Sequence, residues 1–176
     1  MNPAILANGA LFQAAWFSCV LGGANESNLW GLPVLALLAV QSLRGAYTRQ
    51  DVVWAGAALV MGFLLDTLWI QTGILVYDGW TFAPAWILTL WCALGLTMNH
   101  SMSFFAQKPL LGALLAGGSA PLSYLGGERL GAVLVPDPLQ LIWVSLVWGL
   151  VFWLAFILVR RTREVPGSAG VSVASP

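Results

Sequence analysis

Long apolar segments separated by short polar turns dominate this chain of 176 residues. A helix that crosses a bilayer needs about 20 mostly apolar residues, whereas a membrane β-strand needs only about 10 and alternates in polarity. The segments here are too long for such strands and show no alternation. Only 8% of the residues are charged, against about a quarter in soluble domains, so most of the outer surface must face lipid. The sequence therefore predicts an all-α integral membrane bundle.

The breaks between the apolar runs predict about six transmembrane helices. They cover roughly residues 5–23, 29–44, 52–75, 83–105, 109–127 and 139–159. The end of the fifth helix is open, because Gly126-Gly127-Glu128-Arg129 fits either a turn or a continuation of the helix. We expect one transmembrane domain over residues 1–163, followed by a flexible cytoplasmic tail over residues 164–176, which are mostly small or polar.

Basic residues favour one side of the predicted bundle. Six of the seven Lys and Arg residues fall in loops on that side or beside the tail, namely Arg44, Arg49, Lys108, Arg160, Arg161 and Arg163. The opposite side has Glu26, the interfacial turn Tyr77-Asp78-Gly79-Trp80, the pair Glu128/Arg129 and Asp137. Cytoplasmic loops of membrane proteins carry an excess of Lys and Arg. We therefore predict a multi-pass membrane protein with both termini in the cytoplasm.

Composition also narrows the classes of partner. A formal net charge of zero leaves no basic surface for nucleic acid, so no nucleic-acid partner is expected. Cys19 and Cys92 lie in apolar runs without a metal-binding spacing, which favours small packing residues. One histidine and no thiol cluster leave too few ligands for a metal site. No sequence fingerprint indicates a cofactor, so any cofactor is unknown.

Asp66 lies in the third predicted helix, about fourteen residues from its start and thus near mid-membrane at about 1.5 Å per residue. A carboxyl group at that depth is costly unless it is neutral, partnered or wetted. Gly62, one turn earlier on the same face, allows a neighbouring backbone to approach closely. Two interpretations stay open: acid–base catalysis, or a hydrogen bond that locks helix packing.

Asn99 and His100 lie near the end of the fourth predicted helix, and His100 is the only histidine. Adjacent helical residues point about 100° apart, so we expect that the two side chains do not both face one partner head-on. Either one side chain orients the other's neighbour, or the two line different walls of a cavity. We name Asp66, His100 and Asn99 as candidate catalytic residues, with proton transfer as their role. The alternative is that they join helices by hydrogen bonds. We expect these polar groups to form one cluster between the first, third, fourth and fifth helices.

The fifth predicted helix carries a stripe of small residues at helical spacing: Gly112, Ala116, Ser119, Ala120, Ser123 and Gly127. Such a stripe permits close packing between helices, including an oligomer contact, or opens a slot for a substrate chain. Pro121 removes a backbone hydrogen bond and frees a carbonyl in mid-span. Candidate substrate-binding residues are Gln13, Ser119, Ser123, Tyr124, Glu128 and Arg129. Glu128 and Arg129 also fit a simple interfacial ion pair.

Several motifs together resemble an uncharacterised family, a domain of unknown function, of small bacterial multi-pass inner-membrane proteins. The motifs are Phe12-Gln13-Ala-Ala-Trp16, Gly62-Phe-Leu-Leu-Asp66, Thr97-Met-Asn-His-Ser-Met, Lys108-Pro109 and the segment 120–133. The resemblance covers the chain except its tail. It implies a role with membrane lipids, because members are often encoded near lipid-modifying enzymes of the cyclopropane-fatty-acid-synthase type. It implies no established catalytic residues.

Three functions remain open from the sequence. The first is a membrane enzyme, or an enzyme accessory, that acts on a lipid or isoprenoid-like substrate through Asp66 and His100, with Asn99 and Ser119 positioning a polar group. The second is a small transporter or lipid-binding carrier. The third is a structural or assembly subunit. An enzyme predicts a polar pocket reached from within the bilayer, a transporter predicts a path to both sides, and a scaffold predicts no cavity.

Overall fold

The computed structural model describes residues 3–44 and 47–163, and within them the chain is helical. The predicted tail over residues 164–176 lies outside the described residues. The elements in chain order are α1 (Pro3–Ala24), α2 (Leu32–Ser42), α3 (Thr48–Gln71), α4 (Ala85–Gly95), the 3₁₀ helix η1 (Ser103–Gln107), α5 (Pro109–Arg129), the 3₁₀ helix η2 (Pro138–Gln140) and α6 (Leu141–Arg163). No strand occurs in this part of the chain, apart from an isolated antiparallel bridge between Val76 and Leu134. The all-α prediction is confirmed.

Four helical segments are long and apolar enough to cross a membrane: α1, α3, α5 and Pro138–Thr162, which combines η2 with α6 up to Thr162. These are the properties of a membrane protein. The other two helices, α2 and α4, have only 11 residues each, which span about 17 Å, short of the roughly 30 Å of a hydrocarbon core. The predicted helices over 29–44 and 83–105 are therefore shorter in the structure.

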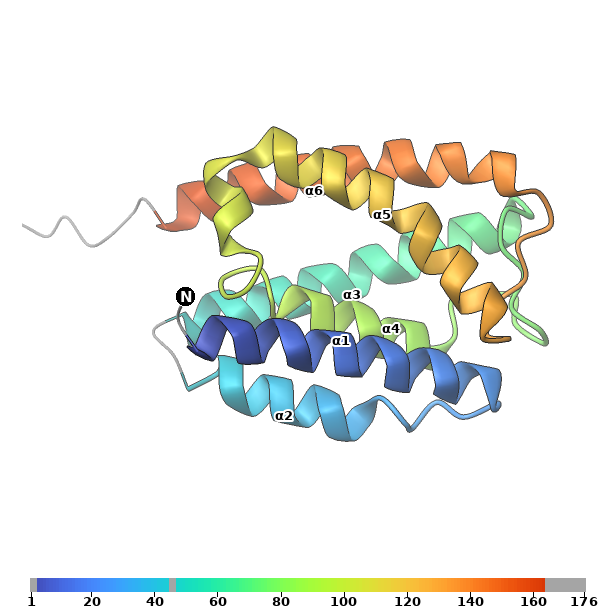
Figure 1. Ribbon diagram of the computed structural model, residues 1–176, viewed down its shortest axis with the longest axis horizontal. Helices are drawn as coiled ribbons and strands as arrows, with labels where there is room; N and C mark the ends of the chain where they lie inside the picture. Colours follow the sequence, from blue (N-terminus) through green and yellow to red (C-terminus); the bar gives the residue numbers. More distant parts are fainter. Residues whose placement is uncertain (1–2, 45–46, 164–176) are drawn as a thin grey trace, which may run out of the picture.

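The helices form two layers (Figure 1). One layer contains α1, α2, α3 and α4, with α4 packed against the other three. The second layer is the antiparallel pair α5 and α6, and η1 packs against both of its helices. The long helices α1, α3, α5 and α6 run from one end of the molecule to the other, and α2 and α4 cover part of that length. Successive α-helices run in alternating directions.

The third helix lies four residues earlier than the sequence pattern predicts, over 48–71 rather than 52–75. Gly73 ends it, because this residue has a φ of +74° that favours glycine. The shift brings Asp51 into the first turn of α3 and places Asp66 only five residues from the last, Gln71. Asp66 therefore lies near the C-terminal end of α3, whereas the sequence predicted a position near the middle of the membrane.

The fourth predicted helix stops at Gly95, and the following residues form turns instead of continuing to residue 105. Gly95 lies against the α3 backbone, where a Cβ would be 2.5 Å from the Trp54 carbonyl oxygen. After it, backbone bonds run from residue i to i−3, as from Met98 to Gly95. The Thr97 hydroxyl donates to the Leu94 carbonyl at 2.6 Å. Polar side chains that bond locally compete with the α-helix, which explains this break.

The fifth helix is continuous through Pro121 and includes Glu128 and Arg129. The segment Gly126-Gly127-Glu128-Arg129 is therefore a continuation of the helix and not a turn. Proline has no N–H for the carbonyl four residues earlier, that of Gly117. The Ser145 hydroxyl of α6 donates to this carbonyl at 2.7 Å. The freed carbonyl that the sequence predicts is thus satisfied by the neighbouring helix. Gly117 permits the contact, because a Cβ there would be 2.8 Å from the Ser145 carbonyl oxygen.

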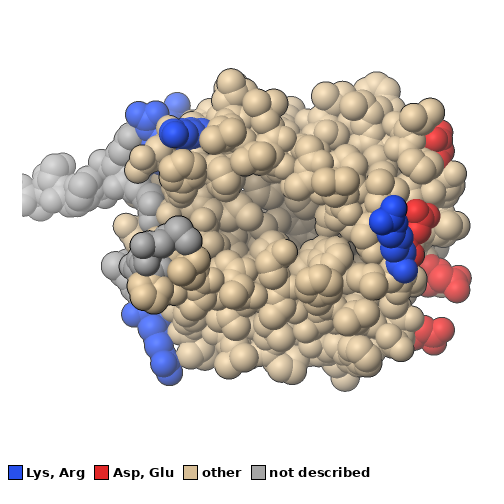
Figure 2. All heavy atoms as spheres, viewed as in Figure 1, with Lys and Arg blue, Asp and Glu red and all other residues tan. Residues whose placement is uncertain are grey.

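Charged side chains gather at the two ends of the molecule (Figure 2). Basic residues gather at one end of the molecule. They lie where α2 and α6 finish and where α3 and α5 begin. The opposite end carries the acidic residues Glu26, Asp78, Glu128 and Asp137, together with Arg129. Between the ends, the visible face is built from uncharged residues.

Candidate functional site

A cavity of about 510 Å³ lies between the two layers, bounded by α1, α4, α5 and α6. Its volume is within the range of roughly 300–1,000 Å³ typical of small-molecule sites. It appears as a recess in the middle of the uncharged face, between α1 and α5 (Figure 2). Its wall is mostly aromatic and aliphatic, and the aromatic residues include Phe12, Trp16, Trp86, Trp91, Phe105, Tyr124, Trp148, Phe152 and Phe156. The site is therefore an apolar cavity that opens sideways from the bundle.

The small-residue stripe of α5 forms one wall of this cavity. All six of its predicted members line the cavity: Gly112, Ala116, Ser119, Ala120, Ser123 and Gly127. The close contacts of α5 with α6 use Gly117 and one member of the stripe, Gly112, where a Cβ would be 2.5 Å from the Phe156 ring. The stripe thus lines the cavity, as the substrate-slot interpretation requires, and also permits a close contact between helices, as the packing interpretation requires. An oligomer contact through the stripe stays a prediction.

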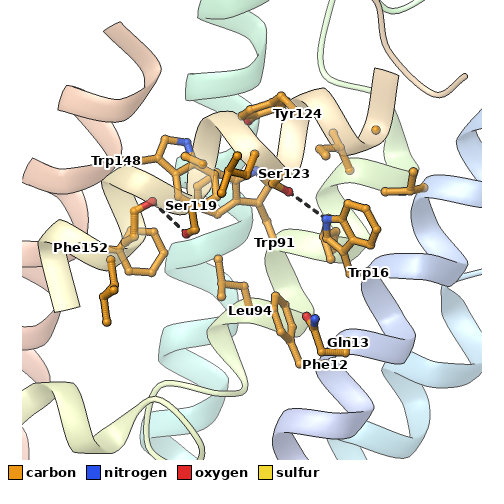
Figure 3. A pocket seen from close by; sticks show the side chains of 18 of the residues that line it. Phe12, Gln13, Trp16, Trp91, Leu94, Ser119, Ser123, Tyr124, Trp148 and Phe152 are labelled. Carbon is orange, nitrogen blue, oxygen red and sulfur yellow. Dashed lines mark hydrogen bonds between the residues drawn. The ribbon is translucent and has the colours of Figure 1, made fainter. Parts of the chain in front are cut away.

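Trp16 of α1 reaches across the cavity to α5 (Figure 3). Its indole Nε1 donates to the Ser123 hydroxyl at 2.9 Å. Gln13 lies about one helical turn before Trp16 on the α1 wall. Ser119 lies about one turn before Ser123 on the α5 wall. Ser119 donates to the carbonyl of Ala116 at 3.1 Å. The polar groups of the cavity therefore concentrate on facing parts of α1 and α5.

Asp66 lies behind the cavity wall and is fully buried. Its Oδ2 accepts a hydrogen bond from Trp91 Nε1 at 2.7 Å, and its Oδ1 accepts from the hydroxyls of Tyr77 and Tyr124 at 3.0 Å each. We call these four residues the Asp66 cluster. All three donors line the cavity, whereas Asp66 does not. The cluster joins α3, α4, α5 and the loop after α3, so Asp66 fixes the aromatic wall in place.

Two contacts in the Asp66 cluster depend on local sequence. Gly62 provides the place for Trp91, because a Cβ at residue 62 would be 2.1 Å from the indole Cγ. The predicted close approach occurs at Gly62, but a side chain makes it and not the predicted backbone. Tyr77 is only 2% exposed, so its ring is buried within the protein, and its interfacial depth stays a prediction. Burial raises the pKa of Tyr77 well above its ordinary value, and the neighbouring Asp66 raises it further, so the phenol remains a hydrogen-bond donor.

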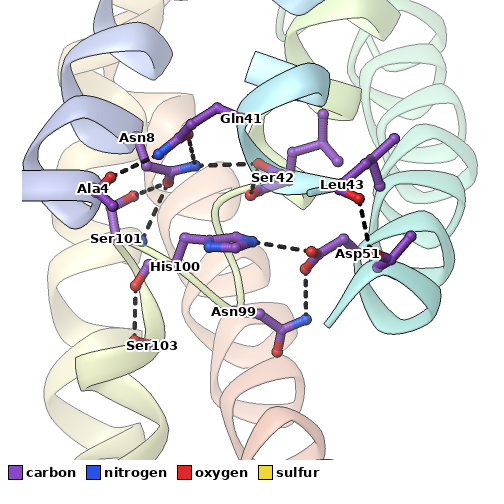
Figure 4. Close-up of polar contacts among 12 residues, drawn as sticks. Ala4, Asn8, Gln41, Ser42, Leu43, Asp51, Asn99, His100, Ser101 and Ser103 are labelled. Atoms are coloured by element: carbon purple, nitrogen blue, oxygen red, sulfur yellow. Dashed lines mark hydrogen bonds and ion pairs between the residues drawn. The ribbon is translucent and has the colours of Figure 1, made fainter. Parts of the chain in front are cut away.

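Asn99 and His100 belong to a second group, which we call the Asp51 cluster (Figure 4). Asn99 Nδ2 donates to Asp51 Oδ1 at 2.9 Å, and His100 Nε2 lies 3.0 Å from Asp51 Oδ2. Asp51 is fully buried, and the His100 side chain is 18% exposed. The expected single cluster with Asp66 is wrong, because Asp51 and Asp66 are fifteen residues apart on α3, about 22 Å along the helix. The expectation that the two side chains do not face one partner is also wrong, because both residues lie in turns rather than in a helix and both contact Asp51. Neither of them lines the cavity.

Asn8 of α1 supports the same turn segment from the other side. Its Nδ2 donates to Gln41 Oε1 at 2.9 Å and to the Ser42 hydroxyl at 3.3 Å. Its Oδ1 accepts from the backbone N–H and the hydroxyl of Ser101 at 3.2 and 2.7 Å. Ser42 in turn donates to the Leu96 carbonyl at 3.2 Å. These bonds satisfy the turns after α4 with side chains from α1 and α2 (Figure 4).

The predicted substrate-binding residues divide into two groups. Gln13, Ser119, Ser123 and Tyr124 line the cavity. Glu128 and Arg129 do not, and within the described residues they form no ion pair with each other. Glu128 Oε1 instead accepts a hydrogen bond from the Val135 backbone N–H at 2.8 Å, which fixes the loop after α5. Their role in binding a substrate stays a prediction.

Sequence reasoning missed Asp51, Tyr77 and the tryptophans of the wall. Asp51 looked like a loop residue because Arg44 and Arg49 precede it. Its position three residues after Thr48 is a usable signal, since acidic residues favour the first turn of a helix. The aromatic wall had only a compositional signal, the ten tryptophans. No group of three or more His, Cys, Asp or Glu side chains gathers into a metal-binding arrangement in residues 3–44 and 47–163.

The fold and cavity define a helical membrane protein with a sideways-opening apolar site. The chain belongs to the family described as "Protein of unknown function (DUF2878)", whose model matches residues 5–154. This confirms the resemblance to an uncharacterised family. No curated protein and no solved structure matches the chain.

Proposed function

We propose that the protein binds the hydrocarbon chain of a membrane lipid or isoprenoid-like compound in the cavity between α1, α4, α5 and α6. The observation that carries this proposal is the opening of an apolar cavity between two helices that are long and apolar enough to cross a membrane. At that depth the surrounding medium is lipid, so lipid chains are the molecules that meet the opening. The proposal corresponds most closely to the lipid-binding carrier among the predicted functions.

The proposed setting is the inner membrane of a bacterium, with six passes and both termini in the cytoplasm. The gathering of basic residues at the end that carries the start of α1 and the end of α6 supports this orientation. The alternating direction of the six α-helices supports the six passes. In this arrangement the cavity opening lies between the two interfaces.

Binding in such a site requires more than apolar surface. A lipid chain is already in an apolar medium, so moving it into the cavity gains little from the hydrophobic effect. Packing must provide the affinity, and the rigid aromatic wall supports this. Trp148 stacks on Phe152 with centroids 5.3 Å apart, and Trp91 lies 4.9 Å from Trp148. The hydrogen bonds of Trp91 and Tyr124 to Asp66 hold two of these rings in fixed positions.

The same cavity would also suit a lipid-modifying enzyme, or an accessory protein that presents the hydrocarbon chain of a lipid to such an enzyme. The catalytic roles of Asp66, His100 and Asn99 stay predictions. Chain binding is better supported than proton transfer, because the oxygens of Asp66 accept three hydrogen bonds behind the wall and His100 belongs to a separate cluster. A purely structural subunit would need no cavity.

Filling the cavity tests the proposal. Ala116→Phe places a ring inside the cavity, and Gly118→Phe is the matched control, since residue 118 is exposed and nothing lies within 4 Å of its Cβ position. Lipids that remain with the purified protein after washing are measured by mass spectrometry. We expect one lipid class to be enriched over the host membrane for the wild type and Gly118→Phe, and to be lost for Ala116→Phe. Equal retention by both variants, or no enrichment at all, would contradict chain binding.

A further inference from the structure

The cavity wall lacks charged side chains, and this limits what it can bind. None of the lining residues, all of which lie in the described ranges, is Asp, Glu, Lys, Arg or His. The Asp66 carboxyl group contacts the wall only from behind, through Tyr77, Trp91 and Tyr124. A charged group held in an apolar site without a partner costs several kcal/mol. An ionised headgroup therefore has no counter-charge in this cavity.

The polar groups of the cavity lie at the middle of their helices. Gln13 and Ser119 each come ten residues after the first residue of α1 and α5, which have 22 and 21 residues. Ten residues correspond to about 15 Å, half of a hydrocarbon core of roughly 30 Å. A ligand group that reaches these side chains is thus far from both membrane interfaces. Only an uncharged group reaches that depth at low cost.

Three side chains at this depth have hydrogen-bonding capacity left over. Ser123 accepts from Trp16, so its own hydroxyl proton is available to a ligand. Ser119 donates to its own helix, so its oxygen can still accept. The Gln13 amide is exposed and takes part in none of the hydrogen bonds found among the described residues. Together they offer both donors and acceptors to a single oxygen-containing group.

We propose that the lipid bound in the cavity is uncharged and carries a hydroxyl or carbonyl oxygen that Ser119, Ser123 and Gln13 bind at mid-membrane depth. Long-chain or isoprenoid alcohols, ketones and quinones belong to this class, whereas fatty-acid carboxylates and phosphate headgroups do not. The inference rests on the proposed function, because it identifies the ligand class of the same cavity. The hydrogen bonds add affinity and orientation where the hydrophobic effect adds little.

Three probes with the same polyene chain test the inference. The full chain is placed in phosphatidylcholine nanodiscs and titrated with all-trans-retinol, with ionised all-trans-retinoate at alkaline pH, and with axerophthene, which lacks the hydroxyl. Quenching of tryptophan fluorescence reports binding, since Trp16, Trp86, Trp91 and Trp148 line the cavity. Protein-free nanodiscs correct for partition into lipid. We expect saturable quenching by retinol and binding of retinoate at least about tenfold weaker.

Ser119→Ala/Ser123→Ala provides the second readout. Loss of hydrogen bonds to an uncharged ligand is expected to weaken retinol binding about fivefold and to leave axerophthene binding unchanged. Ser18→Ala on α1 is the control, because Ser18 does not line the cavity. Retinoate binding as tight as retinol binding, or unchanged retinol binding by the double variant, would overturn the inference and leave chain binding standing. If no probe binds but lipid co-purifies, the inference alone fails; if co-purification also fails, both proposals fall.

Discussion

Asp66 and Asp51 are both fully buried on α3, yet their partners differ in kind. Asp66 accepts hydrogen bonds from three aromatic side chains, one of which comes from α5 in the other layer. Asp51 contacts Asn99 and His100, which both belong to the turns after α4 in its own layer. The first cluster joins the two layers and shapes the cavity, whereas the second fastens an irregular segment to one helix. Two buried carboxyl groups on one helix therefore differ in role according to their partners.

Removing each aspartate should give the largest contrast. Asp66→Ala leaves three donors without their acceptor, and each orphaned buried group costs about 1–3 kcal/mol. We expect the free energy of unfolding in detergent to fall by at least about 3 kcal/mol. Asp51→Ala orphans only two groups, and His100 is part-exposed and can bond to water, so a smaller loss of about 1–3 kcal/mol is expected. A larger loss for Asp51→Ala would reverse the comparison.

A gentler change acts on the Asp66 cluster alone. Gly62→Ala inserts a methyl group where the Trp91 ring lies, and overpacking of this kind costs about 1–3 kcal/mol. Gly56→Ala on the same helix is the matched control, since nothing lies within 4 Å of its Cβ position. We expect thermal unfolding to shift downward for Gly62→Ala only. Fluorescence of the tryptophans should change with it. Equal behaviour of the two variants would show that Trp91 moves aside without cost.

The smallest expected effect concerns the position of α5, which carries Tyr124 into the Asp66 cluster. Ser145→Ala removes the donor to the Gly117 carbonyl and should lower the free energy of unfolding by about 1 kcal/mol. In a Pro121→Ala background the new backbone N–H can take over that carbonyl, so the same change should cost less. Urea titrations of the four proteins measure this coupling. Strict additivity would mean that Ser145 does not compensate for Pro121.

Helices and their breaks were partly predictable from sequence. Glycines and prolines with polar neighbours located most ends within a few residues, because these residues act through local backbone chemistry. The break after Gly95 was missed, since Asn99 and His100 lie in a segment that is apolar enough to read as helix. Its cause is local hydrogen bonding, such as the bond from the Thr97 hydroxyl to the Leu94 carbonyl. The close approach of Gly95 to the α3 backbone at the same place is a tertiary contact, which a local pattern does not reveal.

The candidate site was predictable in its residue types but not in its connections. The stripe of α5, Gln13 and Tyr124 were found because polar and small residues within a span stand out. The partners of Asp66 are 11, 25 and 58 residues away in sequence, and no periodicity links them. Asp51 and His100 are 49 residues apart and pair only because α4 ends early. Which polar residues share a cluster therefore followed from packing.

The hydrogen bond between Trp16 and Ser123, the one that joins α1 to α5, has a kinetic consequence. A neutral hydrogen bond contributes about 1 kcal/mol, less than twice the thermal energy of roughly 0.6 kcal/mol. Thermal fluctuation therefore breaks this bond in a substantial fraction of molecules at any moment. The Trp16–Ser123 hydrogen bond therefore does not hold the opening between α1 and α5 permanently closed. If the cavity binds a lipid chain as proposed, the fit of that chain to the aromatic wall would set its residence time, and its exchange with the bilayer would need no external energy source.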